Sequence, residues 1–206
     1  MNYCQRCVYP ENAKPAIIFD DEGICSGCKL LESRPNINWD ERKERMKVLF
    51  EKYKKQAREN GNPYDCIIPV SGGKDSHYQV YVVKKIYGLN PLLVCYNHGY
   101  NTKRGLRNLN NMVRKMGCDL LRFTTNPDAA KKISCFMLKQ CGDVTWHYHA
   151  GILTFPIQVA VRYKIPLIIW GEIAFGEDVG MFNQNDMFEF TKKHRQEHSL
   201  RGFEPE

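Results

Sequence analysis

The sequence predicts an α/β protein, built on a doubly wound parallel sheet and carrying a small cysteine module at its N-terminus. Beyond residue 62, short apolar runs alternate with helix-length amphipathic stretches, which is the order of elements in βαβ units. The apolar runs are continuous rather than alternately polar, as in strands that are covered on both faces. Two C-x-x-C pairs fall within residues 1–35, a segment too short to fold by core burial alone.

The helix that follows the module is predicted over Asp40–Asn60. Its apolar residues recur at three- and four-residue steps, Asn38 or Asp40 is placed to cap its start, and Gly61-Asn62-Pro63 ends it. Four strands are then expected, at 65–70, 91–96, 119–124 and 166–170. Helices are expected between them, at 77–87, 103–116, 127–141 and 146–163, the last interrupted at Pro156.

These elements divide the chain into four parts. The cysteine module covers 1–35 and the connecting helix lies within 36–62. The α/β domain covers 63–180, and 181–206 is a polar segment that we expect to be incomplete.

Composition and charge limit the functional classes. No apolar run approaches the roughly 18 residues of a membrane helix, and the start at Met1 lacks the pattern of a secretory signal, so we expect a cytoplasmic protein. The formal net charge of +7 has two interpretations: solvated helix faces, or attraction of an anion such as a nucleotide, a nucleotide-linked sugar or RNA. Charge alone does not choose between them.

A candidate phosphate-binding loop stands between the first strand and the first helix of the α/β domain. Its residues are Ser71, Gly72, Gly73, Lys74, Asp75 and Ser76. Two glycines allow a tight turn with uncovered backbone N–H groups, and the helix start behind them completes an anion-binding nest. The serine hydroxyls and the lysine add donors and charge, and the aspartate would hold Mg²⁺ or brace the loop. The motif is neither a Walker A loop nor G-x-G-x-x-G.

The string SGGKDS resembles the signature of the PP-loop ATP pyrophosphatase superfamily. This resemblance implies cleavage of ATP between its α- and β-phosphates and adenylation of a substrate oxygen. It implies ATP and Mg²⁺ as cofactors, and we expect Lys74, Asp75 and Ser76 to be the catalytic residues.

Residues at two other strand ends are expected to line the nucleotide pocket. Asn97 and His98 follow the second strand, and Gly171 and Glu172 follow the fourth, where the superfamily lines its nucleotide pocket. His98 could equally be a hydrogen-bonded structural histidine. The acidic residues after the fourth strand, which include Glu177 and Asp178, would hold Mg²⁺ or substrate, or merely form an acidic loop.

The cysteine module has the spacing of a zinc site. Cys4 and Cys7 are separated by seventeen residues from Cys25 and Cys28, within the C-x₂-C-x₁₅₋₂₀-C-x₂-C pattern. Four thiolates suit a closed tetrahedral structural Zn²⁺ site, which would fold a segment that lacks a core. Buried or redox-active thiols and an iron–sulfur cluster are the alternatives.

Other cysteines and histidines have less definite roles. Cys135 and Cys141 are six residues apart on one predicted helix and share a face poorly, which speaks against a catalytic thiol pair. His147 and His149 lie in an aromatic cluster at the start of the next helix. Sugar stacking, proton transfer and a plain amphipathic helix start all remain open for them.

Four features together resemble the N-acetyl sugar amidotransferases of lipopolysaccharide O-antigen and flagellin nonulosonic acid biosynthesis. They are the cysteine module, SGGKDS, WHYHAGI at 146–152 and IIWGEIAFGED at 168–178. The resemblance covers most of the chain. Members of that family are longer, so we expect this chain to be a truncated form.

This second resemblance implies a specific reaction. ATP would adenylate the N-acetyl carbonyl oxygen of a nucleotide-linked sugar, and ammonia would displace AMP to leave an acetamidino group. The ammonia would come from a separate glutaminase partner, and no membrane partner is implied.

Two alternatives stand beside it. A PP-loop tRNA thiolation enzyme would explain the zinc module and the basic charge, but it needs a catalytic thiol pair or cluster ligands. A non-enzymatic nucleotide-binding scaffold for a glutaminase would bind ATP without forming AMP.

Overall fold

The computed structural model describes residues 1–12 and 17–171, apart from the side chain of Arg34. The described residues form two compact units, Met1–Glu41 and Arg42–Gly171. The first unit holds a short helix, α1 (Ser26–Ser33), and a 3₁₀ turn, η1 (Arg34–Asn36). The second unit is the α/β domain, and the helix α2 (Trp39–Glu59) begins at the junction between the units.

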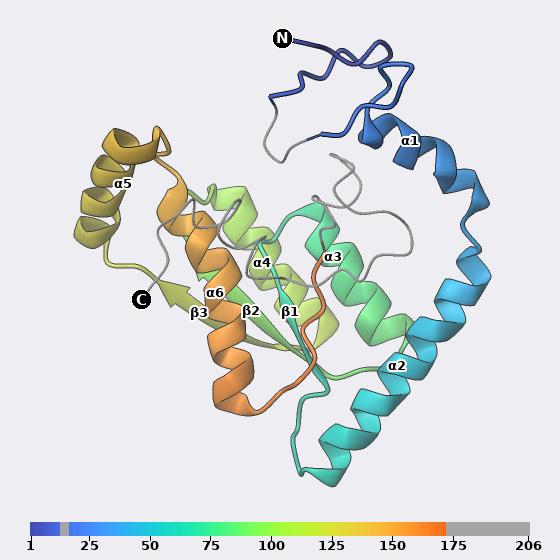
Figure 1. Ribbon diagram of the computed structural model, residues 1–206. Coiled ribbons are helices and arrows are strands. Elements are labelled where there is room, and N and C mark those ends of the chain that lie inside the picture. The colour runs from blue at the N-terminus through green and yellow to red at the C-terminus, as the bar shows by residue number, and fades with distance from the viewer. Residues whose placement is uncertain (13–16, 172–206) are drawn as a thin grey trace. The chain divides into compact units, whose positions relative to one another are not determined.

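The second unit is built on a parallel sheet of order β1-β2-β3 (Figure 1). Its strands are β1 (Cys66–Pro69), β2 (Pro91–Asn97) and β3 (Asp119–Thr124). On the edge of β1 away from β2, Ile67 donates to the carbonyl of Leu167 at 2.8 Å and accepts from the N–H of Ile169 at 2.9 Å. The fourth predicted strand, 166–170, is therefore reduced to one parallel bridge. Pro166 has no N–H to extend the ladder.

Helices cover both faces of this sheet (Figure 1). They are α3 (Lys74–Tyr81), its π-helical extension η2 (Val82–Ile86), α4 (Lys103–Met116), α5 (Pro127–Cys141) and α6 (Trp146–Tyr163). Successive strand residues point to opposite faces, so Ile68 joins a core with Val80 and Leu109, whereas Ile67 joins a second core with Val159 of α6. The predicted doubly wound parallel sheet is confirmed.

Two local predictions were wrong, and one helix was not predicted. The module contains α1, whose eight residues are too few for a helical period to stand out. The first sheet helix begins at Lys74 rather than His77, because the loop glycines lead straight into it. Pro156 does not interrupt α6: it is fully buried inside the helix, and core packing there outweighs the missing backbone hydrogen bond.

Candidate functional site

The phosphate loop lies where the sheet changes direction. From β1 the chain proceeds outward through β2 and β3, and then returns through α6 to place 167–169 on the other edge of β1. Such a switch point leaves a crevice at the carboxyl end of the central strand, where open α/β sheets bind ligands. Residues 71–76 begin one residue beyond Val70, whose N–H bonds to the carbonyl of Val94 in β2.

Gly72 fixes the path of this loop. Its φ is +84°, a left-handed conformation that L side chains rarely adopt. A Cβ at this position would lie 2.9 Å from the carbonyl oxygen of Gly105 and 3.1 Å from Cβ of Leu109, both in α4. The loop backbone therefore packs directly on the first turns of α4.

The N–H groups that follow this glycine lie at the start of α3. The amide of Gly73 bonds to Oγ of Ser71 at 3.3 Å. Those of Lys74, Asp75 and Ser76 open α3 and have no partner among the described residues, as is usual for the first turn of a helix. The binding of an anion by these N–H groups, which the sequence predicts, stays a prediction.

Two side chains of α3 brace the nest from behind. Ser76 donates its hydroxyl to the carbonyl oxygen of Gly73 at 3.1 Å, and Nδ1 of His77 lies 2.8 Å from the same oxygen. Ser76 would have to give up this bond to serve a phosphate. Its role in the structure is to hold the turn.

The charged residues of the loop point into solvent. Lys74 pairs with its neighbour Asp75 at 2.6 Å, and both side chains are largely exposed. An exposed pair of this kind contributes little free energy, so a phosphate can replace the carboxylate at small cost. The ammonium group is thus available to an anion in the nest.

The end of β2 is held by its own hydrogen bonds. Asn97 donates to Oγ1 of Thr124 at 3.0 Å and accepts from the side-chain amide of Asn101 at 2.7 Å. The ring of His98 accepts from the N–H of Tyr100 at 3.0 Å. Burial, and then the charge of Arg122, lowers the pKa of His98, which favours its neutral form. Asn97 shapes the loop, and His98 keeps one ring nitrogen for a ligand.

A hydrogen bond that the sequence did not predict connects α3 to residues 167–169, the segment that pairs with β1. Gln79 donates its side-chain amide to the carbonyl of Ile169 at 2.6 Å. A Cβ at Gly171 would lie 2.7 Å from Oε1 of the same glutamine. Gly171 therefore lies beside the helix that carries the nest. Glu172, Glu177 and Asp178 lie outside the described residues.

The aromatic motif of α6 meets the loop after β2. Tyr148 is central, with ring centroids 4.7–6.1 Å from those of four neighbours. We call this group the ring cluster; it comprises His98, Tyr100, His147, Tyr148 and His149. His147 is only 5% exposed, and neither of its ring nitrogens has a partner among the described residues. Burial, and then the charge of His98, lowers its pKa.

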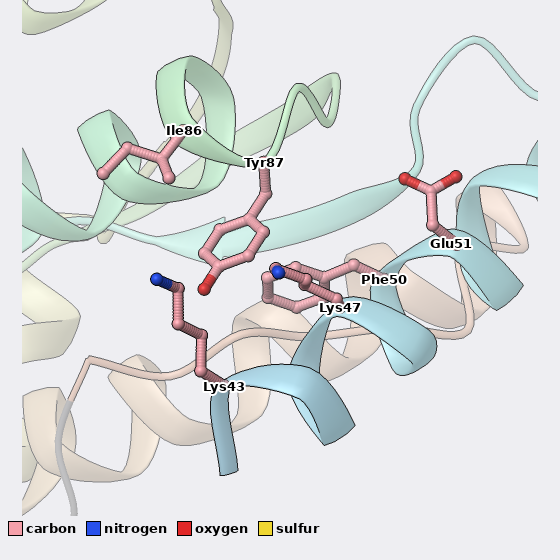
Figure 2. Close-up of a pocket in the computed structure, with 6 residues that line it drawn as sticks. All are labelled: Lys43, Lys47, Phe50, Glu51, Ile86 and Tyr87. Atoms are coloured by element: carbon pink, nitrogen blue, oxygen red, sulfur yellow. The ribbon is translucent and has the colours of Figure 1, made fainter. Parts of the chain in front are cut away.

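A surface pocket of about 430 Å³ lies elsewhere, between α2 and η2 (Figure 2). Its lining residues are Lys43, Lys47, Phe50, Glu51, Ile86 and Tyr87. The rings of Phe50 and Tyr87 meet edge to face at 5.1 Å, so its floor belongs to the hydrophobic core. None of its lining residues belongs to the phosphate loop or the ring cluster.

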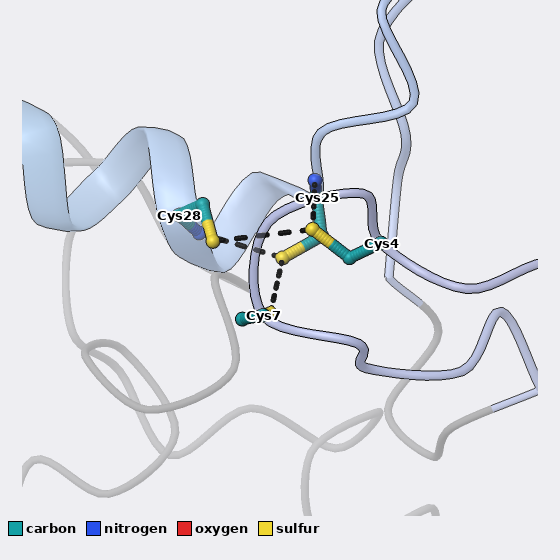
Figure 3. Close-up of side chains that lie close together, drawn as sticks. All are labelled: Cys4, Cys7, Cys25 and Cys28. Carbon is teal, nitrogen blue, oxygen red and sulfur yellow. Dashed lines mark hydrogen bonds between the residues drawn. The ribbon is translucent and has the colours of Figure 1, made fainter.

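The first unit brings its four predicted metal ligands together (Figure 3). All four sulfur atoms lie within 4.8 Å of one another, with Cys4 and Cys28 at 4.0 Å and Cys7 and Cys25 at 3.6 Å. Zinc–sulfur bonds of about 2.3 Å in a tetrahedron require sulfur–sulfur distances of about 3.8 Å. The thiol positions therefore fit a tetrahedral ion.

Backbone N–H groups point at these sulfurs and prepare them for a cation. Cys4 accepts from the amides of Arg6 at 3.4 Å and Cys25 at 3.3 Å. Burial alone would raise its pKa, but the backbone hydrogen bonds together lower it to about 6. Burial and the neighbouring thiols raise the pKa of Cys28 to about 12. Four thiols crowded without a cation repel a second negative charge, and a metal ion removes that conflict.

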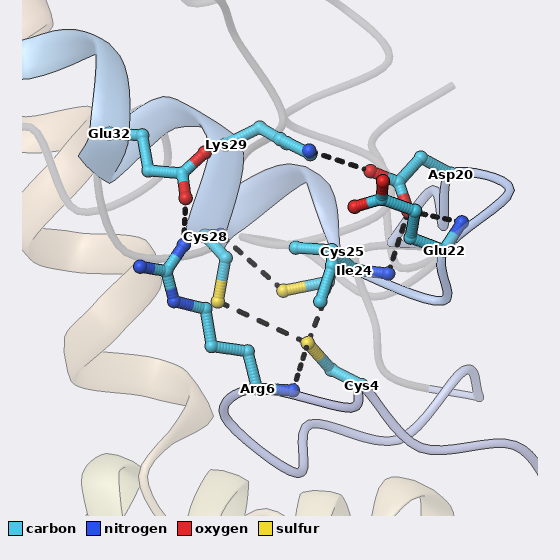
Figure 4. A network of polar contacts seen from close by, with 9 residues as sticks. All are labelled: Cys4, Arg6, Asp20, Glu22, Ile24, Cys25, Cys28, Lys29 and Glu32. Atoms are coloured by element: carbon cyan, nitrogen blue, oxygen red, sulfur yellow. Dashed lines mark hydrogen bonds and ion pairs between the residues drawn. The ribbon is translucent and has the colours of Figure 1, made fainter.

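Ion pairs hold the turns that present the cysteines (Figure 4). Lys29 contacts Asp20 at 2.9 Å, and that carboxylate also accepts the amide of Ile24 at 2.8 Å. These hydrogen bonds, that of Lys29 first, lower the pKa of Asp20. Arg6 pairs with Glu32 across the module. The turn that leads into Cys25 is thereby fixed on α1.

The fold is that of an α/β protein with a glycine-containing loop at the switch point of a parallel sheet, accompanied by a four-cysteine module. No model of a known protein family matches the chain. Over 119 residues, 57% of this chain, the sequence is 31% identical to the uncharacterized protein MJ1599 of Methanocaldococcus jannaschii. The match covers 41% of that protein, so the chain spans less than half the length of this curated relative.

Solved structures resemble the chain more distantly. NMN synthetase from Francisella tularensis is 14% identical, with a TM-score of 0.46 over 68% of this chain and 58% of that one. NH3-dependent NAD synthetase from Campylobacter jejuni is 12% identical, with a TM-score of 0.47 over 80% and 77%. A predicted subunit of tRNA methyltransferase from M. jannaschii is 18% identical, with a TM-score of 0.37 over 55% and 70%. Likenesses at this level do not say which ligand the chain binds.

In the described part of the chain, the helices are all too short or too polar to cross a lipid bilayer.

Proposed function

We propose that this chain is an ATP-consuming enzyme that releases AMP and pyrophosphate while it adenylates a carbonyl oxygen of its substrate. The observation that carries this proposal is the uncovered nest at the start of α3. Unpaired N–H groups of residues 74–76, an exposed Lys74 that pairs only with its neighbour Asp75 among the described residues, and the glycine turn that leads into them are together at the carboxyl end of β1. A polyphosphate is the ligand that such a nest suits best.

The chemistry asks little of the protein beyond positioning and charge. The carbonyl oxygen of the substrate attacks the α-phosphorus, the bond from that phosphorus to the bridging oxygen breaks, and pyrophosphate leaves with the electron pair. The loop amides and Lys74 would stabilise the charge that builds up on the leaving pyrophosphate. Asp75 is the loop carboxylate that would hold Mg²⁺, which supplies further charge neutralisation when bound.

The substrate that we propose is a nucleotide-linked N-acetyl sugar. Its acetamido carbonyl is a poor electrophile until its oxygen is adenylated, and ammonia then displaces AMP to leave an acetamidino group. The sequence resemblance to N-acetyl sugar amidotransferases supports this step and its place in surface polysaccharide biosynthesis. A separate glutaminase, also from that resemblance, would supply the ammonia.

We propose further that the cysteine module binds one structural Zn²⁺. The sulfur–sulfur distances of 3.6 and 4.0 Å and the N–H groups aimed at Cys4 support this role. Zinc peptides of this kind gain about 10–16 kcal/mol from the metal, enough to fold a module whose own core is three residues, Cys4, Ile17 and Cys25.

The thiolation alternative receives less support. Cys135 and Cys141 both lie in α5, and six residues on a helix point about 120° apart and are about 9 Å apart along the axis. The thiol of Cys141 donates to the carbonyl of Met137 at 3.3 Å. The two thiols are thus not poised to act on one substrate.

The proposal is tested by product release. The full chain is incubated with Mg·ATP, ammonia and a panel of nucleotide-linked N-acetyl sugars, and AMP and pyrophosphate are measured against a Lys74→Ala control. We expect sugar-dependent AMP that the control lacks. ATP binding without AMP in any mixture would instead support the scaffold alternative.

A further inference from the structure

The ring cluster is a second feature at the edge of the sheet that carries the phosphate loop. Tyr148 contacts the rings of His98 at 5.3 Å and Tyr100 at 6.1 Å, so the start of α6 and the loop after β2 form one aromatic surface. Tyr100 is 67% exposed and leaves a ring face open to solvent. An exposed aromatic face can stack on the apolar face of a ligand ring, and polar side chains beside it can hydrogen-bond to the edge of that ring.

This surface adjoins the phosphate loop through α4. The loop from His98 to Thr102 leads directly into α4, where Oγ1 of Thr102 caps the helix by accepting from Gly105 at 3.0 Å. The carbonyl of the same Gly105 is the atom that a Cβ on Gly72 would meet at 2.9 Å. One turn of α4 therefore touches the nest and follows the ring cluster in sequence.

His147 gives this surface an unsatisfied polar group. A neutral imidazole carries one donor and one acceptor, and here both lack a partner among the described residues although the side chain is buried. Buried polar groups are normally hydrogen-bonded, because leaving them unpaired is costly. The other titratable groups of the cluster are His98, His149, Tyr100 and Tyr148. Solvent does not reach either nitrogen among the described residues, so a ligand would bond to them only where a neighbouring ring of the cluster turns aside.

Positive charge lies at the start of the adjoining helix. Lys103 and Arg104 are exposed in the first turn of α4, and neither forms an ion pair with the residues that the structure describes. They follow Tyr100 by three and four residues. The phosphates of a ligand whose ring stacks on the ring cluster would thus lie near the positive side chains of Lys103 and Arg104.

We propose that the ring cluster binds the acceptor substrate, a phosphorylated compound with an uncharged polar ring such as a nucleotide-linked sugar. The ring stacks on Tyr100, the ring of Tyr148 turns to admit the ligand's polar edge to the buried His147, and Lys103 and Arg104 contact the phosphates. This inference rests on the proposed function, because it places the acceptor beside the nest that holds ATP. It assigns a binding role to His147 and none in catalysis.

The test is a pair of titrations on the full chain by isothermal calorimetry, one with UDP-N-acetylglucosamine and one with α,β-methylene-ATP. The variants are Tyr100→Ala, whose exposed side chain is removed without harm to the core, and His147→Phe. Tyr163→Ala, at the other end of α6 and 43% exposed, is the matched control. We expect about a tenfold loss of sugar-nucleotide affinity in both variants and none in the control, with methylene-ATP affinity unchanged.

Three results would overturn the inference. They are no binding of UDP-N-acetylglucosamine to the unaltered chain, equal binding to the Tyr100→Ala variant, and a parallel loss of methylene-ATP, which would make the cluster a nucleobase site for ATP. Tighter binding of oligouridine, lost in Tyr100→Ala, would assign the cluster to RNA instead. If methylene-ATP fails to bind at all while the sugar nucleotide does, the proposed function fails, and the ring cluster remains a sugar-nucleotide site without an acceptor role.

Discussion

Gly151 of α6 lies against the ring of Tyr96 in β2 so closely that a Cβ on the glycine would come within 2.2 Å of Cζ. The tyrosine hydroxyl accepts a hydrogen bond from Oγ1 of Thr125 at 2.6 Å, which holds the ring in place. This contact seats the start of α6, and with it the ring cluster, on the sheet.

Gly151→Ala should therefore destabilise the domain, by about 1–3 kcal/mol, because the helix must move away from a fixed ring. Urea unfolding measures the change. Tyr96→Leu in the same chain should recover part of the loss, since it removes the ring that the new methyl group strikes. If the double variant loses more unfolding free energy than the two single variants lose together, this packing is contradicted.

The two glycines of the phosphate loop should respond differently to alanine. Gly72 combines a positive φ with contact to α4, so Gly72→Ala should cost about 1–3 kcal/mol of folding stability. Gly73 has extended backbone angles, and a Cβ there would meet only Oγ of Ser71 at 3.4 Å. The free energy of unfolding of Gly73→Ala should lie within about 0.5 kcal/mol of that of the unaltered chain. Equal destabilisation by both changes would show that the loop follows another path.

The cysteine module should contain about one zinc ion per chain. Metal analysis of the purified protein, before and after a chelator, measures it. Cys4→Ser and Cys25→Ser should each abolish tight binding, because both sulfurs are buried within the group. Cys135→Ser, on the exposed face of α5, serves as the control and should retain the metal. Zinc that persists in Cys4→Ser would mean that the ion binds elsewhere.

Stability should fall in mild acid, in part through His147. Burial lowers its pKa in the folded state, whereas the unfolded chain keeps a value of about 6.5. Above that value both states are neutral and the stabilisation is complete. As the pH falls through it toward the folded pKa, the unfolded state takes up the proton first and stability is lost.

His147→Gln should therefore lose less stability than the unaltered chain between pH 7.5 and 5.5, as measured by urea unfolding at each pH. His149→Gln is the control, because that residue is adjacent in the same cluster but exposed. His98 keeps part of the dependence in both variants, since burial lowers its pKa too. Identical slopes for the two variants would exclude His147 as a source of the effect.

The elements that local signals determine were the ones that the sequence predicted well. Helix α4 runs from the cap at Thr102 to a left-handed Gly117, and α5 runs from the cap at Asn126 to a left-handed Gly142, with the predicted bounds. The fourth strand was overestimated, because pairing along 166–170 depends on what β1 offers at its edge. Helix α1 was missed, because the cysteine turns rather than its own residues position it.

The site divides in the same way. The nest at 71–76 follows from residue types in a fixed order, and the cysteine spacing likewise brings its four sulfurs together. The contacts of Gly151 with Tyr96 and of Gln79 with Ile169 join residues far apart in the chain, and no local pattern announces them. A glycine inside a helix indicates that another part of the chain packs closely on it, but it does not indicate which residue does so.

The most direct test of the account is a calorimetric titration of the full chain with α,β-methylene-ATP and with AMP. The account predicts that the triphosphate analogue binds at least about tenfold more tightly than AMP, and that Lys74→Ala removes most of this difference whereas the exposed Lys85→Ala keeps it. Equal affinity for the two nucleotides, or a Lys74→Ala variant that binds the analogue as well as the unaltered chain does, would contradict it.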